Sequence, residues 1–149
     1  MKRIVLISCS NKKQDRKSKA KDLYVSDLFK KSLAYAQKLN PDKIFILSAL
    51  HHLLDLDKEI EPYNVTLSYV SPKNRKTGLK ILTSKEKVEW GEKIVEQLKK
   101  EADIEKDTFI FLSGQEYIKP IVKSIKNYED ILNGLRQGER KKFLNGVLK

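Results

Sequence analysis

Three short apolar runs stand out along the chain, and each is rich in β-branched residues. They cover residues 3–8 (RIVLIS), 43–49 (KIFILSA) and 108–113 (TFIFLS). Continuous apolar runs of this length are typical of strands that are buried on both faces of a parallel sheet. The pattern therefore predicts three central strands.

Segments with helical spacing separate and follow these strands. The first begins at Ser26, which can cap it, and ends at Asn40-Pro41. Further amphipathic segments cover residues 84–102, 114–125 and 138–148. Strand, helix and strand in close succession imply parallel, right-handed crossovers. We therefore expect one α/β domain over residues 1–149, with three layers, in which helices flank a mainly parallel sheet of three to five strands.

Polar segments connect these elements. Residues 11–22 hold six basic side chains and are predicted to form a mobile surface loop. Residues 72–78 form a second basic loop. Residues 51–68 are interrupted by Pro62, which indicates an irregular excursion rather than a long regular element.

The composition is strongly basic. Lys and Arg number 31 against 20 Asp and Glu, which gives a formal charge of +11 and a pI near 9.6. Such a charge favours polyanionic partners, and nucleic acid is the partner that we expect. The alternative is that the lysines are spread over solvated faces and serve no partner.

Hydrophobic residues make up 40% of the chain, which is too many for a disordered protein. No segment approaches the roughly 20 apolar residues of a membrane helix, so we expect no membrane association. Cys9 is the only cysteine and cannot form an internal disulfide. The N-terminal apolar run of about six residues is shorter than a signal-peptide core. These features predict a cytoplasmic protein.

Each predicted strand ends in small polar residues. These are Ser8-Cys9-Ser10, Ser48-Ala49 and Ser113-Gly114. Ligands of open parallel sheets bind outside the carboxyl ends of the strands, where small residues allow close approach to the backbone. We expect Ser8, Ser10, Ser48, Gly114 and the later Tyr63 to converge on one crevice. The alternative is that serine and glycine simply begin ordinary loops.

The segment after the first strand suits an anion. Ser8, Cys9 and Ser10 offer hydroxyl and backbone N–H groups, and Lys12 and Lys13 add positive charge. The glycines of a P-loop are absent, so ATP hydrolysis of that type is not expected. Cys9 itself is expected to be a small buried side chain and not a nucleophile.

Titratable residues gather after the second strand. His51 can act as a general acid or base, and Asp57 or Glu61 could serve as a base beside the pocket. The alternatives are a capping or half-buried histidine and acidic residues that balance the basic loops. Adjacent histidines such as His51 and His52 rarely point at one ion, and a metal site would need carboxylates such as Asp55 or Asp57, so no metal site is expected. No cofactor is expected either.

Four tyrosines lie in or beside the irregular stretches and strand ends, where their rings could stack on bases. They are Tyr24, Tyr63, Tyr69 and Tyr117. Tyr63 is the favoured one, because Pro62 limits the backbone before it.

Several short motifs together resemble the YaaA superfamily, which comprises a peroxide-stress protein and its small uncharacterised relatives. The motifs are ISCSNKK, DLYVSDLF, ILSALHHLLDLDKEIEPYNVTL, LSGQEY and GLRQGERKKFL. The resemblance implies a DNA-binding α/β protein linked to stress response and the protection of DNA. It places the following residues on the family's motif positions: Ser8, Cys9, Ser10, Lys12, Lys13, Tyr24, Ser48, Pro62, Tyr63, Gly114 and Tyr117. His52 stands where the family usually has a glycine, at a turn that would need a positive φ.

The leading hypothesis is a nucleic-acid-binding or processing domain, for DNA rather than RNA, with a nucleotide pocket at the strand ends. Its serines and lysines would hold phosphate, Tyr63 would stack, and N-glycosidic hydrolysis is the reaction that fits. One alternative is a DNA-binding protein without catalysis. Another is a thiol enzyme that uses Cys9 and a histidine on a small molecule.

Overall fold

The three predicted strands form the centre of a five-stranded sheet in the computed structural model, which describes residues 1–149. They are β1 (Arg3–Ser8), β3 (Lys43–Ser48) and β8 (Thr108–Leu112), and β1 pairs in parallel with both neighbours. The sheet order is β4-β3-β1-β8-β9. Residues 4–7 of β1 are buried, as the apolar run predicted.

Both edge strands were absent from the prediction. β4 (His52–Asp55) returns antiparallel to β3 through a tight turn, and β9 (Asn127–Asp130) pairs in parallel with β8. β4 begins inside the segment that was expected to be irregular, and β9 has a polar sequence with no apolar run to reveal it. Edge strands need pairing on one side only, so little burial marks them.

His52 opens β4 in the left-handed region, with φ +66°. This is the conformation that the resemblance implied for a glycine at the same position. A histidine adopts it at a cost of about 1–2 kcal/mol relative to the usual backbone regions.

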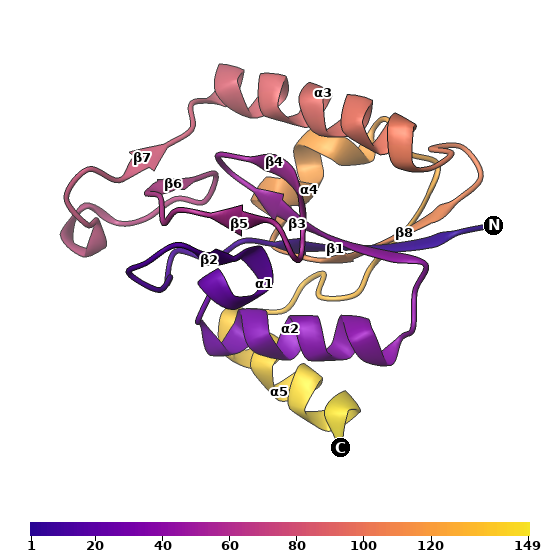
Figure 1. Cartoon of the computed structure of the whole chain (residues 1–149), viewed down its shortest axis with the longest axis horizontal. Helices are drawn as coiled ribbons and strands as arrows, with labels where there is room; N and C mark the ends of the chain where they lie inside the picture. The colour runs from indigo at the N-terminus through magenta and orange to yellow at the C-terminus, as the bar shows by residue number, and fades with distance from the viewer.

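Four longer helices lie on the two sides of the sheet (Figure 1), and α5 packs against α2. Figure 1 shows α3 and α4 above the sheet and α2 and α5 below it. Ser26 caps α2 by accepting a hydrogen bond from the Phe29 N–H at 3.2 Å, as its sequence predicted. Thr83 and Glu86 form a reciprocal capping box at the start of α3. The helices are α2 (Asp27–Lys38), α3 (Ser84–Glu101), α4 (Gln115–Val122) and α5 (Gln137–Leu148).

Short strands and turns organise the segments that were predicted as loops. β2 (Ser18–Lys19) pairs antiparallel with β5 (Glu59–Ile60), and β6 (Val65–Thr66) pairs in parallel with β7 (Lys80–Ile81). Between β2 and α2, the single helical turn α1 (Ala20–Leu23) buries its two apolar side chains. The prediction of a plain surface loop over residues 11–22 is therefore wrong in its second half, because residues 18–22 form β2 and the start of α1, and Ala20 joins the core.

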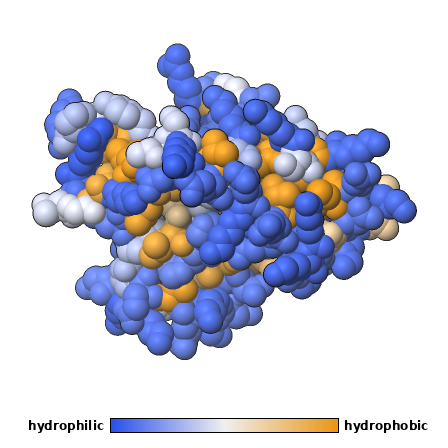
Figure 2. All heavy atoms as spheres, turned by 90° about the horizontal axis from the view of Figure 1, so that it is seen from above, coloured by the Kyte–Doolittle hydropathy of each residue, from blue (hydrophilic) through white to orange (hydrophobic).

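The buried apolar side chains form one continuous cluster around the sheet. Figure 2 looks onto the α3 face, where hydrophilic side chains dominate and hydrophobic groups are visible only between them. No helix has the length and apolar character that would let it cross a membrane. The carboxyl ends of β1, β3 and β8 point away from the N-terminus, toward the segments that carry β2, β5, β6 and β7 (Figure 1).

Candidate functional site

A polar cavity of about 580 Å³ lies at the carboxyl ends of β1 and β8. Four other parts of the chain complete its wall: the first turns of α2 and α4, the start of α5, and the segment after β6. It is lined by Ser8, Cys9, Ser10, Asn11, Lys12, Ser26, Asp27, Leu28, Phe29, Ser32, Thr66, Ser68, Tyr69, Leu112, Ser113, Gly114, Tyr117, Leu132, Gln137, Arg140 and Lys141. We call this cavity the strand-end pocket.

The segment after β1 forms one wall. Pairing with β3 continues one residue past the strand, because the Cys9 N–H donates to the Leu47 carbonyl at 3.0 Å. The chain then turns, and the Ser10 hydroxyl donates to the Lys12 carbonyl at 3.2 Å. Ser8, Ser10 and Lys12 therefore line the pocket, as the sequence analysis expected.

The junction of β8 and α4 forms the opposite wall. The buried Ser113 hydroxyl donates to the Gly114 carbonyl at 3.0 Å. Gly114 is the N-cap of α4 and supplies no side-chain acceptor, so the first N–H groups of this helix have no side-chain cap. A Cβ atom at Gly114 would lie 3.5 Å from Arg140 Nη1. Helix amides and a guanidinium therefore converge at this wall.

Three cations line the pocket without an ion-pair partner: Lys12, Arg140 and Lys141. The Arg140 Nε–H donates to the Leu135 carbonyl at 2.9 Å, which fixes the guanidinium stem against the turn before α5. Sequence reasoning missed both α5 residues. The motif GLRQGERKKFL contains them, but nothing in it indicates that α5 packs against α2 and reaches the strand ends.

Asp27 is the one acidic residue in the wall. Its carboxylate pairs with Lys31 Nζ at 2.7 Å. The hydrogen bond from Lys31 lowers the pKa of Asp27 below its usual value, and the charges of Lys31, Lys141 and Lys30 act in the same direction. The carboxylate is therefore ionised at neutral pH, and the cations around it leave the pocket positive overall.

A second group of predicted residues lies next to the pocket and not in its wall. Tyr63 Oη is 2.6 Å from Tyr24 Oη and 2.7 Å from Ser48 Oγ, and Ser48 Oγ accepts the His51 backbone N–H at 3.0 Å. Lys13 Nζ stands 4.4 Å from the centre of the Tyr63 ring. We call these five residues the hydroxyl cluster.

Cys9 lines the strand-end pocket and is buried. Its Sγ lies 3.4 Å from Tyr117 Oη, and no imidazole is within hydrogen-bond distance of it. Burial raises the pKa of Tyr24, of Tyr63 and of Tyr117, and proximity to Cys9 raises each further. These phenols therefore stay neutral and act as hydrogen-bonding groups.

Two further shifts concern the nitrogen bases of the cluster. Burial lowers the pKa of Lys13, and Lys76 lowers it as well, while Cys9 opposes both. Burial, followed by the charge of Lys58, lowers the pKa of His51. The imidazole of His51 is consequently neutral at pH 7, and its ring lies edge-on to Tyr63 with the centroids 5.3 Å apart.

The predicted catalytic residues do not meet at the strand-end pocket. Asp57 is exposed and pairs with Lys21 Nζ at 3.1 Å, and Glu61 is exposed without an ion-pair partner. His51 belongs to the hydroxyl cluster. The acidic segment folds outward because β5 pairs with β2 on the surface, which takes both carboxylates away from the strand ends.

The predicted convergence holds for part of the set. Ser8, Ser10 and Gly114 line one cavity, together with Cys9 and Tyr117. Ser48 and Tyr63 do not line this cavity. They belong to the hydroxyl cluster, where their hydroxyls are hydrogen-bonded to each other. The Tyr63 ring meets Lys13, His51 and Tyr24, so a base cannot stack on it without displacing them.

Residues 4–146 match a family described as a family of unknown function, DUF6884. No curated protein and no solved structure gives a significant match.

Proposed function

We propose that this chain, which belongs to the DUF6884 family, binds nucleic acid by receiving one phosphate-bearing nucleotide in the strand-end pocket. The observation that carries the proposal is the meeting of three unpaired cations with the uncapped start of α4 at the carboxyl ends of β1 and β8. DNA is the preferred substrate in this proposal, because the motif resemblance to the YaaA superfamily implies DNA binding and protection of DNA under stress.

The phosphate would lie between Gly114 and Arg140. Backbone N–H groups at a helix start, together with the helix dipole, favour an anion, and a guanidinium adds paired charge-assisted donors. Arg140 Nη1 already stands beside Gly114, so both contributions reach the same point. Lys12 and Lys141 stand in the remaining wall and would neutralise further charge.

The rest of the nucleotide would fill the pocket. A volume of about 580 Å³ falls within the usual range of small-molecule sites, roughly 300–1,000 Å³. The lining hydroxyls of Ser8, Ser10 and Ser113 can bond to sugar and base edges. We interpret the fold as three layers, an arrangement that leaves this edge of the sheet open to a ligand.

We also propose that the protein acts in the cytoplasm.

If the N-glycosidic bond of the bound nucleotide is hydrolysed, Asp27 is the carboxylate that would act as the general base. It lines the pocket and is ionised, as a general base must be, whereas Asp57 and Glu61 lie outside. Thiol chemistry has less support, because Cys9 contacts a phenol and not an imidazole.

The test compares neighbouring lysines of α5. Lys141→Met and Lys142→Met each remove one positive charge, but only Lys141 lines the pocket. Binding of a fluorescein-labelled single-stranded DNA oligonucleotide is measured by fluorescence anisotropy. We expect about tenfold weaker binding for Lys141→Met, as for the loss of one charged hydrogen bond, and a change of about twofold for Lys142→Met.

Salt provides the second measurement. The affinity for DNA should fall steeply between roughly 50 and 200 mM salt. The reason is that lysine and arginine side chains, when they contact phosphates, release the counterions of the nucleic acid. Equal losses for the two lysine variants would mean that DNA binds to the general surface and not to the pocket. No binding at low salt would remove the proposal altogether.

A further inference from the structure

Tyr69 differs from the other three tyrosines near the strand ends. Tyr24 and Tyr117 are 1% and 4% exposed, and the Tyr63 hydroxyl and ring are occupied within the hydroxyl cluster. Tyr69 is 73% exposed, makes no hydrogen bond through its hydroxyl, and still contributes to the wall of the strand-end pocket. A large aromatic ring is therefore presented to solvent at the rim of a cationic pocket.

Arg75 holds this ring in place. Its Nε–H donates to the Val70 carbonyl at 2.7 Å, and its guanidinium carbon lies 5.7 Å from the centre of the Tyr69 ring. A hydrogen bond from the Ser68 N–H to Thr66 Oγ1, at 3.0 Å, fixes the turn that precedes the tyrosine. We call Tyr69 and Arg75 the rim platform.

We propose that the rim platform stacks on an unpaired base, and that the ligand of this protein is single-stranded nucleic acid. One nucleotide occupies the strand-end pocket and the base of its neighbour stacks on Tyr69. This inference rests on the proposed function of the pocket. Stacking on aromatic rings and on arginine is the main way in which proteins bind single strands without reading a sequence.

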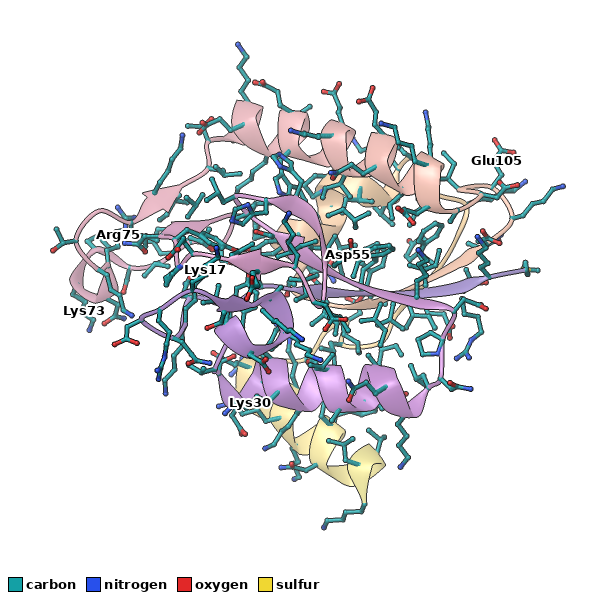
Figure 3. The ribbon with its side chains drawn as sticks, in the orientation of Figure 1. Lys17, Lys30, Asp55, Lys73, Arg75 and Glu105 are labelled. Carbon is teal, nitrogen blue, oxygen red and sulfur yellow. The ribbon has the colours of Figure 1, made fainter.

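The charge beside the rim platform suits the backbone of such a strand. Residues 62–85 contain no acidic side chain and carry five basic ones. Among these, Lys73, Arg75 and Lys76 have no ion-pair partner. Figure 3 shows Lys73 and Arg75 at the same end of the molecule as Lys17, which comes from the other basic segment.

The two basic segments approach each other beside the pocket. Burial is the main cause that lowers the pKa of Lys13, and the charge of Lys76 adds to it, so the positive charge of one basic segment is felt in the other. Neighbouring cations repel each other, and an anion between them would relieve that repulsion. Successive phosphates of a strand that leaves the pocket past Tyr69 would supply that anion.

The geometry favours a single strand over a duplex. The pocket is recessed, since Ser113 and Cys9 in its wall are buried, and a base that is stacked and paired in a duplex cannot enter it. A ring face at the rim likewise requires an unstacked base. A duplex could contact only the exposed lysines at the surface through its phosphates. Because it offers no unstacked base, its affinity would not depend on Tyr69.

The experiment measures dissociation constants for a labelled thymidylate strand of about ten nucleotides and for a hairpin in which the same strand is covalently joined to its adenylate complement, so that the duplex stays paired at low salt. The variants are Tyr69→Ala and Tyr69→Phe. Tyr128→Ala is the matched control, because Tyr128 is also exposed, at 46%, but lies on β9 outside the pocket. Thermal unfolding by circular dichroism confirms that each variant is folded.

We expect Tyr69→Ala to weaken binding of the single strand about 5- to 100-fold and to leave duplex binding within about twofold. Tyr69→Phe keeps the ring and should bind within about twofold of the parent protein, as should Tyr128→Ala. Unchanged single-strand binding in Tyr69→Ala, or an equal loss for strand and duplex, overturns the inference.

The inference can fail while the pocket proposal stands. In that case Lys141→Met still binds more weakly than Lys142→Met, although Tyr69→Ala has no effect on the single strand. If neither strand nor duplex binds the parent protein at low salt, both proposals fail together.

Discussion

Gly91 offers a sharp test of how α3 and α4 support the strand-end pocket. It lies in the buried face of α3, directly against Pro120 of α4. A Cβ added there would stand 2.4 Å from the Pro120 carbonyl oxygen, 2.6 Å from its Cβ and 2.8 Å from its carbonyl carbon. Carbon contacts in cores lie near 3.5–4.0 Å, so Gly91→Ala must push the helices apart by about 1 Å.

The cost follows from what that movement disturbs. Two of the three contacts are backbone atoms, which cannot rotate away, and the buried Trp90 and Tyr117 rings pack edge to face beside them. Overpacking of this kind costs about 1–3 kcal/mol, and the rigid contacts place Gly91→Ala near the upper end. Alanine regains about 1 kcal/mol of helix propensity. We expect the free energy of unfolding to fall by about 2 kcal/mol.

Gly146→Ala is the matched control, because a Cβ at this α5 position meets no atom within 4 Å. It should raise stability by up to about 1 kcal/mol through helix propensity alone. Urea and thermal unfolding, followed by circular dichroism, measure both variants. A melting temperature about 4–8 °C lower is expected for Gly91→Ala, since each kcal/mol shifts it by about 2–4 °C. Equal stabilities would refute the close packing of α3 on α4.

The histidines predict a dependence on pH. Burial lowers the pKa of His51 and of His52, so the unfolded chain takes up protons first as pH falls, and stability decreases below about pH 6.5. The free energy of unfolding, measured between about pH 5.5 and 7.5, should depend less on pH when both histidines are replaced by glutamine. Ordinary carboxylates titrate below this range and do not contribute to the difference. Cys9→Ser should keep DNA binding within about threefold, because a hydroxyl can replace the contact of Sγ with Tyr117. A loss beyond about tenfold would show that Sγ contributes to binding in a way that a hydroxyl cannot replace.

The sequence allowed the central sheet to be predicted because burial on both faces leaves a continuous apolar run. β1, β3 and β8 all carry this mark. β9 has the polar sequence NYED, and β4 depends on a tight turn with an unusual histidine. Neither feature produces a periodic pattern, so neither could be predicted from apolar spacing.

The pocket residues that follow the strands could be predicted from the sequence, but those that reach the pocket through helix packing could not. Ser8, Ser10 and Gly114 follow their strands directly, so parallel pairing alone brings them to one edge. Arg140 and Lys141 reach the same place only because α5 packs against α2. In the sequence they are two more cations of a lysine-rich helix.

The buried tyrosines explain how the excursion after β3 returns to the pocket. Tyr63 ties it to Ser48 at the end of β3, and Tyr117 Oη lies 3.3 Å from Thr66 Oγ1 and accepts the Leu67 N–H at 3.4 Å. These hydroxyls hold the chain in position just before Tyr69.

A division of labour among the tyrosines follows from these contacts. A ring that fixes backbone must be buried and hydrogen-bonded, whereas a ring that stacks on a base must be free. Tyr24 and Tyr117 are buried, Tyr63 is half-buried, and all three hydroxyls are hydrogen-bonded, whereas Tyr69 is exposed and its hydroxyl makes no hydrogen bond. Three of the tyrosines that were predicted to stack on bases are therefore engaged within the fold, and Tyr69 is the one that our proposal assigns to the ligand.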